Sequence, residues 1–366
     1  MERDWVAEDE ELFVTRDTQL WYRDGTVVLQ AERKLFKVYA GILSRASPVF
    51  RDMFALGSSH STSEAGRSEM YEGRPLVATA GDTAADMRAF LTALHDSSLD
   101  FSSQYIDAKS LKLVDIPRII SILRLSTKYD VVHLRRRAIE ALQVWYPRNV
   151  SSYISLSSSS TPREDLLRHI TIANIARETG SFVLLPAALL FCCSTADART
   201  LYDGVSVDGV YHDLHPDNKR AIFIGRPLLM HHARTRTQGF FFNPHFSEGS
   251  GQKCLTAERC AEFRKIYTSV YDHKEDPWMN PFFRLNWKAI RSACCTNCTL
   301  SWETHNLRGM KDLWEELPAL FDLTSWAVVE EYFESSVRNL PEHTGPLNQD
   351  VVPDADMHPV EDMARS

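Results

Sequence analysis

The chain has 366 residues, of which 44% are hydrophobic and 25% charged, a composition typical of a globular protein of about two domains. Its formal net charge of −8 argues against sequence-independent binding to nucleic acid, which depends on neutralising phosphates. No apolar run reaches the roughly 20 residues of a membrane span. Seven cysteines without an apolar leader predict reduced thiols, and so a cytoplasmic or nuclear location.

The first 150 residues carry strand and helix signals in alternation. Residues 1–14 are acidic and are expected to be a flexible lead-in to a domain that spans residues 15–150. An edge strand is predicted near residues 13–22. Two runs rich in β-branched and aromatic residues, at 26–29 and 35–39, predict a β-hairpin.

Two helices should follow this hairpin. A short helical segment is predicted at residues 41–45. Ser47 and Pro48 then form a favourable helix start, because serine caps the free N–H groups and proline at the first position loses no hydrogen bond. The helix that they open carries one apolar stripe, made of Val49, Phe50, Met53 and Phe54.

A second informative block closes the predicted domain. A strand at residues 76–79 precedes Thr83 and Asp86, which have capping-box spacing and predict the start of a helix. Beyond a polar stretch, residues 115–147 predict a helical hairpin whose first helix is capped at Asp115.

These two blocks resemble the opening and the closing segments of a BTB/POZ domain. The family pattern of a strand, an aromatic strand and an "Sp.F..mf" helix matches residues 27–29, 36–39 and 47–54. The closing "A.kY.v..L" pattern matches residues 125–135. Over residues 20–150 the amino-acid sequence is similar to BTB-domain proteins that are abundant in basidiomycete fungi. A fainter similarity extends to about residue 340. The resemblance implies an α+β domain in which helical hairpins accompany a small sheet.

One position departs from that pattern. Tyr39 stands where most members of the family carry histidine, and Asp24 is the only candidate for the aspartate with which that histidine pairs. The resemblance implies that the pair is a structural hydrogen bond. We therefore expect the local geometry of this corner, rather than the fold, to differ.

The second half of the chain is predicted to be all-α. Residues 151–160 are rich in serine and suggest an interdomain linker, and residues 161–340 carry a series of helix signals without a strong strand run. Residues 341–366 are rich in proline, lack apolar periodicity, and are expected to be a disordered tail.

Four cysteines have a spacing that suggests a metal site. Cys254 and Cys260 form a C-x5-C pair, and Cys295 and Cys298 form a C-x-x-C pair with Cys294 beside it. Four thiolates can hold zinc in a tetrahedral structural site. Buried free thiols are the alternative, because C-x5-C is looser than an ordinary zinc knuckle. Zinc is the only cofactor that the sequence suggests.

No nucleotide-binding, serine-hydrolase or metalloprotease motif occurs, so an enzyme is not expected. Arg135–Arg137 and the histidines at 212, 215, 231 and 232 are interpreted as solvated side chains, since neither set has companions at a ligand or catalytic spacing.

The resemblance implies a protein that binds other proteins. BTB domains commonly form homodimers and recruit partners, and some are substrate adaptors for cullin-type ubiquitin ligases; a transcriptional co-regulator and a zinc-binding scaffold are the alternatives. No direct nucleic-acid, membrane or small-molecule partner is expected. The residues predicted to face a partner are Ile42, Phe50, Met53, Phe54, Tyr71 and Glu72.

Overall fold

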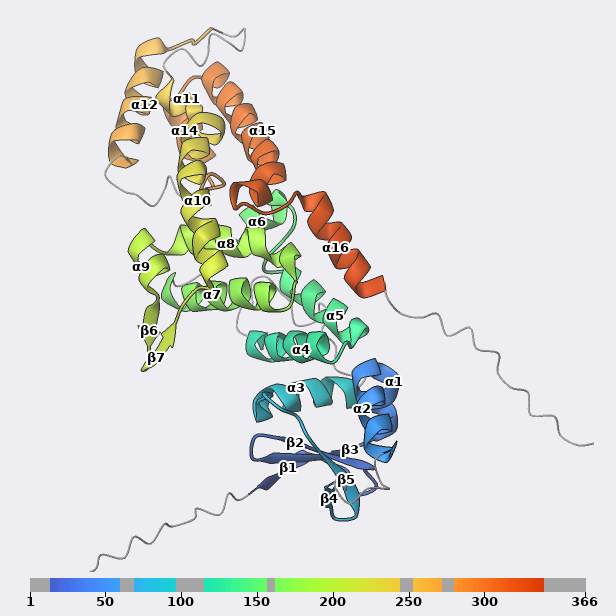
Figure 1. Ribbon diagram of the computed structural model, residues 1–366. Helices are drawn as coiled ribbons and strands as arrows, with labels where there is room; N and C mark the ends of the chain where they lie inside the picture. The colour runs from blue at the N-terminus through green and yellow to red at the C-terminus, as the bar shows by residue number, and fades with distance from the viewer. Residues whose placement is uncertain are drawn as a thin grey trace, which may run out of the picture.

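The computed structural model describes residues 14–59, 69–96, 115–156, 162–243, 253–271 and 280–338. Over these residues the chain forms an N-terminal five-stranded mixed sheet with helices, followed by a mostly helical region (Figure 1). The predicted α+β class is confirmed at this level. The described helices include none that is long and apolar enough to cross a membrane.

The sheet has the strand order β1-β3-β2-β5-β4. Its strands are β1 (Thr15–Trp21), β2 (Val27–Ala31), β3 (Lys34–Val38), β4 (Met70–Tyr71) and β5 (Arg74–Ala78). The hairpin of β2 and β3 is antiparallel, whereas β1 pairs with β3, and β5 with β2, in parallel. The central strand β2 is almost wholly buried, which explains the run of three apolar residues with which it begins, Val27–Leu29.

Five helices complete the N-terminal part: α1 (Ala40–Ala46), α2 (Pro48–Ser59), α3 (Ala84–His95), α4 (Ile116–Lys128) and α5 (Val132–Gln143). Their starts follow the predicted caps. The Ser47 hydroxyl accepts the Phe50 N–H at 3.0 Å, and Thr83 accepts the Asp86 N–H at the same distance. The Asp115 carboxylate likewise caps α4.

The two sequence blocks meet in the core of this part. Phe50 from α2 stacks on Tyr129 after α4, with ring centroids 4.3 Å apart, and Phe90 of α3 lies beside both rings. The Ser47 hydroxyl also donates to the Tyr129 carbonyl oxygen at 2.5 Å. The opening and closing segments therefore form one packed unit.

The helical region is built from α6 (Val150–Leu156), α7 (Pro162–Glu178), α8 (Leu185–Thr195), α9 (Ala198–Asp203), α10 (Pro216–His232), α11 (Gly239–Phe242), α12 (Ala257–Tyr271), α14 (Trp287–Ala293), α15 (Thr296–Leu320) and α16 (Trp326–Arg338). A 3₁₀ turn, η1 (Phe182–Leu184), and a π-helical turn, η2 (Ala233–Thr237), lie between helices. The region also contains a hairpin of β6 (Val205–Val207) and β7 (Val210–His212). The all-α prediction is therefore wrong here.

The serine-rich stretch is not simply a linker. Residues 150–156 form α6, and Tyr153 on this helix is fully buried against Phe282 and Trp314. The burial of one large ring fixes a helix whose serines give it little propensity of its own. Residues 157–160 of the predicted linker, the lead-in up to residue 13 and the predicted tail lie outside the described residues.

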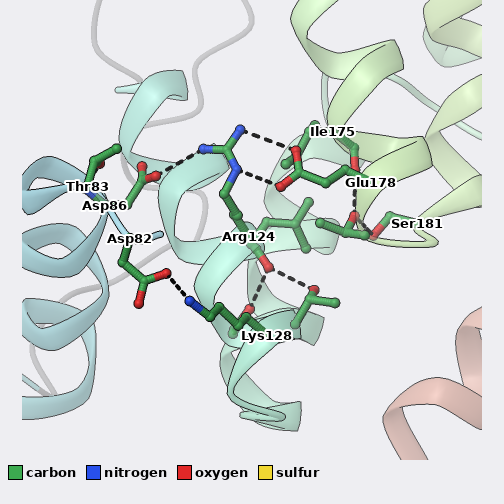
Figure 2. A network of polar contacts seen from close by, with 12 residues as sticks. Asp82, Thr83, Asp86, Arg124, Lys128, Ile175, Glu178 and Ser181 are labelled. Atoms are coloured by element: carbon green, nitrogen blue, oxygen red, sulfur yellow. Dashed lines mark hydrogen bonds and ion pairs between the residues drawn. The ribbon is translucent and has the colours of Figure 1, made fainter. Parts of the chain in front are cut away.

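A polar network on α4 joins the sheet-bearing part to the helical region (Figure 2). Arg124 reaches Asp86 of α3 at 3.1 Å and Glu178 of α7 at 2.8 Å. One turn on, the Lys128 ammonium lies 2.6 Å from the buried Asp82 carboxylate, which also accepts the Tyr129 hydroxyl. Helix α4 thus contacts both parts of the molecule.

Candidate metal centre and N-terminal surface

The four predicted cysteines come together at the starts of two helices. Cys254 precedes α12 and Cys260 lies in its first turn; Cys295 is the N-cap of α15 and Cys298 lies in the first turn of that helix. Their four sulfur atoms all lie within 4.8 Å of one another. Sequence spacing therefore identified a set of side chains that the fold brings to one point.

A small second core, separate from the main one, surrounds this cysteine cluster. Its buried apolar residues include Phe240, Phe241, Leu285, Ile290 and Trp302, together with Cys260, Cys294 and Cys298. Figure 1 shows α11, α12 and α14 at the end of the molecule opposite the sheet. The Asn297 amide donates to the Lys253 carbonyl oxygen at 3.0 Å, which fixes the two cysteine segments to each other.

Backbone and hydroxyl groups point at the sulfur atoms. The Cys295 N–H donates to Cys260 Sγ at 3.3 Å, and the Thr256 hydroxyl lies 3.5 Å from the same sulfur. Burial disfavours the Cys295 thiolate, but the backbone N–H groups of Cys298 and Leu255 outweigh it and lower the pKa of Cys295 to about 6. Such N–H groups at a helix start favour anionic sulfur.

The pKa values of two other thiols of the cluster move in the opposite direction. Burial raises the pKa of Cys254 and of Cys298 above that of an ordinary thiol. With four sulfur ligands and no carboxylate or imidazole, the donor set suits zinc or iron. A disulfide is the other chemistry within reach, since the sulfur atoms of Cys254 and Cys295 are 3.8 Å apart.

Cys294 lies beside the cluster without joining it. It is buried in the second core, its sulfur is not one of the four converging atoms, and burial raises its pKa to about 12. Among the described residues, the cysteine cluster is the only group of three or more potential ligand side chains that converge within reach of one ion.

The residues predicted to face a partner have unequal positions on the N-terminal part. Ile42 on α1 is exposed, and Met53 and Phe54 on α2 are half-buried against the main core. Phe50 is fully buried and stacked on Tyr129, which corrects its assignment to a partner surface. The apolar face of α2 is wider than the part of the helix that packs on the core. Phe50 lies on the side of this face that points into the core.

Tyr71 and Glu72 interact with a side chain of the opposite edge strand. Arg16 of β1 forms an ion pair with Glu72 and lies 3.4 Å from the Tyr71 hydroxyl, while the Trp21 ring meets Tyr71 edge-on at 6.0 Å. The first and last strands of the sheet are therefore joined by their side chains. Glu72, with φ of 49°, occupies the tight turn between β4 and β5.

Sequence reasoning missed two exposed apolar residues of α2. Val49 and Leu56 are seven residues apart, so they share one face of the helix, and both are exposed. This i, i+7 spacing is visible in the sequence. Together with Ile42 on α1, which packs against α2, they make up what we call the α1–α2 surface.

The departure at Tyr39 is compensated locally. The Tyr39 hydroxyl donates to Asp24 Oδ1 at 2.7 Å, and its ring stacks on Tyr22 with centroids 5.0 Å apart. The hydrogen bond from Tyr39 lowers the pKa of Asp24. A tyrosine hydroxyl thus supplies the donor that the resemblance assigns to histidine.

The remaining histidine and arginine runs have structural partners. His215 Nδ1 accepts the Asp217 N–H and caps α10. Arg136 forms an ion pair with Glu334 of α16 at 3.2 Å, which joins α5 to α16. Arg135–Arg137 are half-buried, which corrects their interpretation as solvated side chains; α16 packs against the helix that carries them.

Comparisons of this chain with protein-family models, with curated proteins and with solved structures gave no match.

Proposed function

We propose that this chain is a non-enzymatic protein-interaction scaffold of the BTB/POZ type that self-associates through the α1–α2 surface. The observation that supports this proposal best is the exposure of Ile42, Val49 and Leu56, at 39%, 37% and 62%, on two helices that pack together. Single exposed apolar residues are ordinary on a protein surface, but three on adjoining helices favour a binding surface.

The charges beside this surface favour a second copy of the chain as the partner. Arg51 and Asp52 are both exposed on α2, 3.6 Å apart, so the surface carries both signs in close proximity. A two-fold interface brings each residue of a patch against the same patch, and a patch with both charges can match itself. A surface of one sign would repel its own copy.

We limit the proposed partner to a second copy. Phe54 is half-buried against the main core and Glu72 pairs with Arg16 at the surface, so neither belongs to the exposed apolar group of Ile42, Val49 and Leu56. If a cullin is nevertheless bound, Phe54→Ala and Glu72→Ala should weaken its co-purification with the full-length chain.

The self-association is tested with Ile42→Asp and Val49→Asp. Both positions lie in the first turn of a helix, where an acidic side chain suits the helix dipole, so the fold should persist. The wild-type chain should give about twice the monomer mass of 41.8 kDa by light scattering at high micromolar concentration, and each variant should give the monomer mass.

Phe223→Asp is the matched control, because Phe223 is an exposed apolar residue on the distant helix α10. It should leave the mass of the wild type unchanged. A wild-type chain that stays monomeric, or a dimer that both aspartate variants retain, would contradict the proposed surface.

A further inference from the structure

We propose that Cys254, Cys260, Cys295 and Cys298 bind one zinc ion, and that this ion holds the second core together. The inference is independent of self-association, because the cysteine cluster lies at the other end of the molecule from α1 and α2 (Figure 1).

The geometry of the cluster is close to that of a zinc site. In a tetrahedral Zn–S4 centre with Zn–S bonds of about 2.3 Å, the sulfur atoms are about 3.8 Å apart. Cys254 and Cys295 already have this separation, and every other pair lies within 4.8 Å. Shifts of about 1 Å at most would complete the tetrahedron, and side-chain rotations at helix starts can supply shifts of this size.

The surroundings of the sulfur atoms favour the charge that a metal requires. Two helix N-termini point at the cluster, and the Cys295 N–H and the Thr256 hydroxyl approach Cys260 Sγ. Four thiolates this close would repel one another strongly without a cation. On binding, four Zn–S bonds form, the remaining S–H bonds break, and their protons go to solvent, leaving a centre with a formal charge of −2.

The second core is small enough to require a stabilising cross-link such as a metal ion. It has few buried apolar residues and is separate from the main core. Among the described elements, α12 packs mainly against the short helices α11 and α14. Small cores are seldom stable without a disulfide or a metal. A zinc ion would join the start of α12 to the start of α15, and so anchor the outermost helix to the longest one.

Metal content tests the site directly. The full-length chain, purified without chelator under reducing conditions, should contain one zinc per chain by elemental analysis. Cys254→Ser and Cys298→Ser, one from each pair, should each lower the affinity for zinc by more than the roughly 10- to 100-fold that loss of a second-shell partner costs. Each purified variant should therefore hold well below one zinc per chain. Cys294→Ser, in the same core but outside the cluster, should keep its zinc.

Cobalt substitution adds a test that does not depend on the variants folding. The wild-type chain loaded with Co²⁺ should show the intense visible bands of a tetrahedral thiolate complex, with sulfur-to-metal charge transfer in the near ultraviolet. A chain that contains iron in place of zinc, a Cys254–Cys295 disulfide found by mass spectrometry, or a metal-free chain that takes up no Zn²⁺ or Co²⁺ would each overturn the proposal.

Hydrogen exchange tests separately whether zinc stabilises the second core. Removal of zinc by a strong chelator should increase hydrogen exchange in residues 253–271 and 287–302 and leave α4 and α5 unchanged. Readdition of Zn²⁺ should restore the protection. Unchanged hydrogen exchange after complete removal of zinc would show that zinc does not stabilise the second core.

Discussion

His169 shows how one buried side chain makes the stability of the protein depend on pH. It is buried, its Nδ1 shares a hydrogen bond of 2.9 Å with the Tyr146 hydroxyl, and its ring stacks on Phe191 at 4.7 Å. Burial lowers the pKa of His169 from the ordinary 6.5 to about 3. The imidazole is therefore neutral in the folded chain throughout the mildly acidic range.

The sign of the effect follows from proton binding. Between pH 6.5 and 3 the unfolded chain binds a proton at His169 that the folded chain does not bind, so the free energy of unfolding falls as the pH falls. His169 alone should contribute a slope of up to about 1.4 kcal/mol per pH unit in this window, and none above it.

We expect His169→Asn to have a shallower slope of unfolding free energy against pH from 6.5 to 5, whatever its absolute stability. Urea unfolding at a series of pH values measures the slope. Equal slopes for His169→Asn and the wild type would show that His169 titrates alike in both states.

Single residues also show what the sequence could and could not predict. The caps at Ser47, Thr83 and Asp115 were predictable because a short side chain and the adjacent N–H groups decide them locally. The burial of Phe50 beside the exposed Val49 was not predictable from the sequence. The elements that pack against α2 determine which of its apolar residues face the core.

At the scale of elements, the contact between α15 and η2 depends on a glycine. A Cβ built on Gly309 would lie well inside 3.0 Å of the Arg236 carbonyl oxygen, and the Asn306 amide donates to the Thr237 carbonyl oxygen at 2.7 Å. The backbones of the two elements therefore approach too closely to admit a side chain at Gly309.

Gly309→Ala should lower the free energy of unfolding by about 1–3 kcal/mol, because the backbones must separate to admit the methyl group. Gly41→Ala is the control: this helical glycine has nothing within 4 Å of the added Cβ and should stabilise the chain by up to about 1 kcal/mol. Thermal and denaturant unfolding measure both. A stabilising Gly309→Ala would contradict the close approach.

The β6–β7 hairpin and the full length of α15 were both absent from the sequence-based prediction, for different physical reasons. Residues 205–212 carry Asp208-Gly209 between two short runs, Val-Ser-Val and Val-Tyr-His, and both turn residues have positive φ. Asp-Gly is a strong signal for a hairpin turn, so this hairpin was predictable. The full length of α15, from Thr296 to Leu320, was not, because tertiary packing rather than local propensity sustains so long a helix.

At the scale of the whole molecule, the main core crosses the predicted domain boundary at residue 150. Buried residues from Leu20 in the sheet to Phe333 in α16 belong to one apolar cluster, and Arg124 pairs with carboxylates on both sides of α4. The buried apolar residues form instead this main core and the second core around the cysteines. Local periodicity cannot predict such a division, because it depends on which helices pack together.

The central claim is that the α1–α2 surface is where two copies of the chain meet. Hydrogen–deuterium exchange, compared between dilute and concentrated full-length protein, tests it most directly. The claim predicts that residues 40–56 gain protection as the concentration rises, and that Ile42→Asp abolishes this gain. Protection gained elsewhere, for instance at residues 198–212, or no change at a concentration where the protein is dimeric, would contradict it.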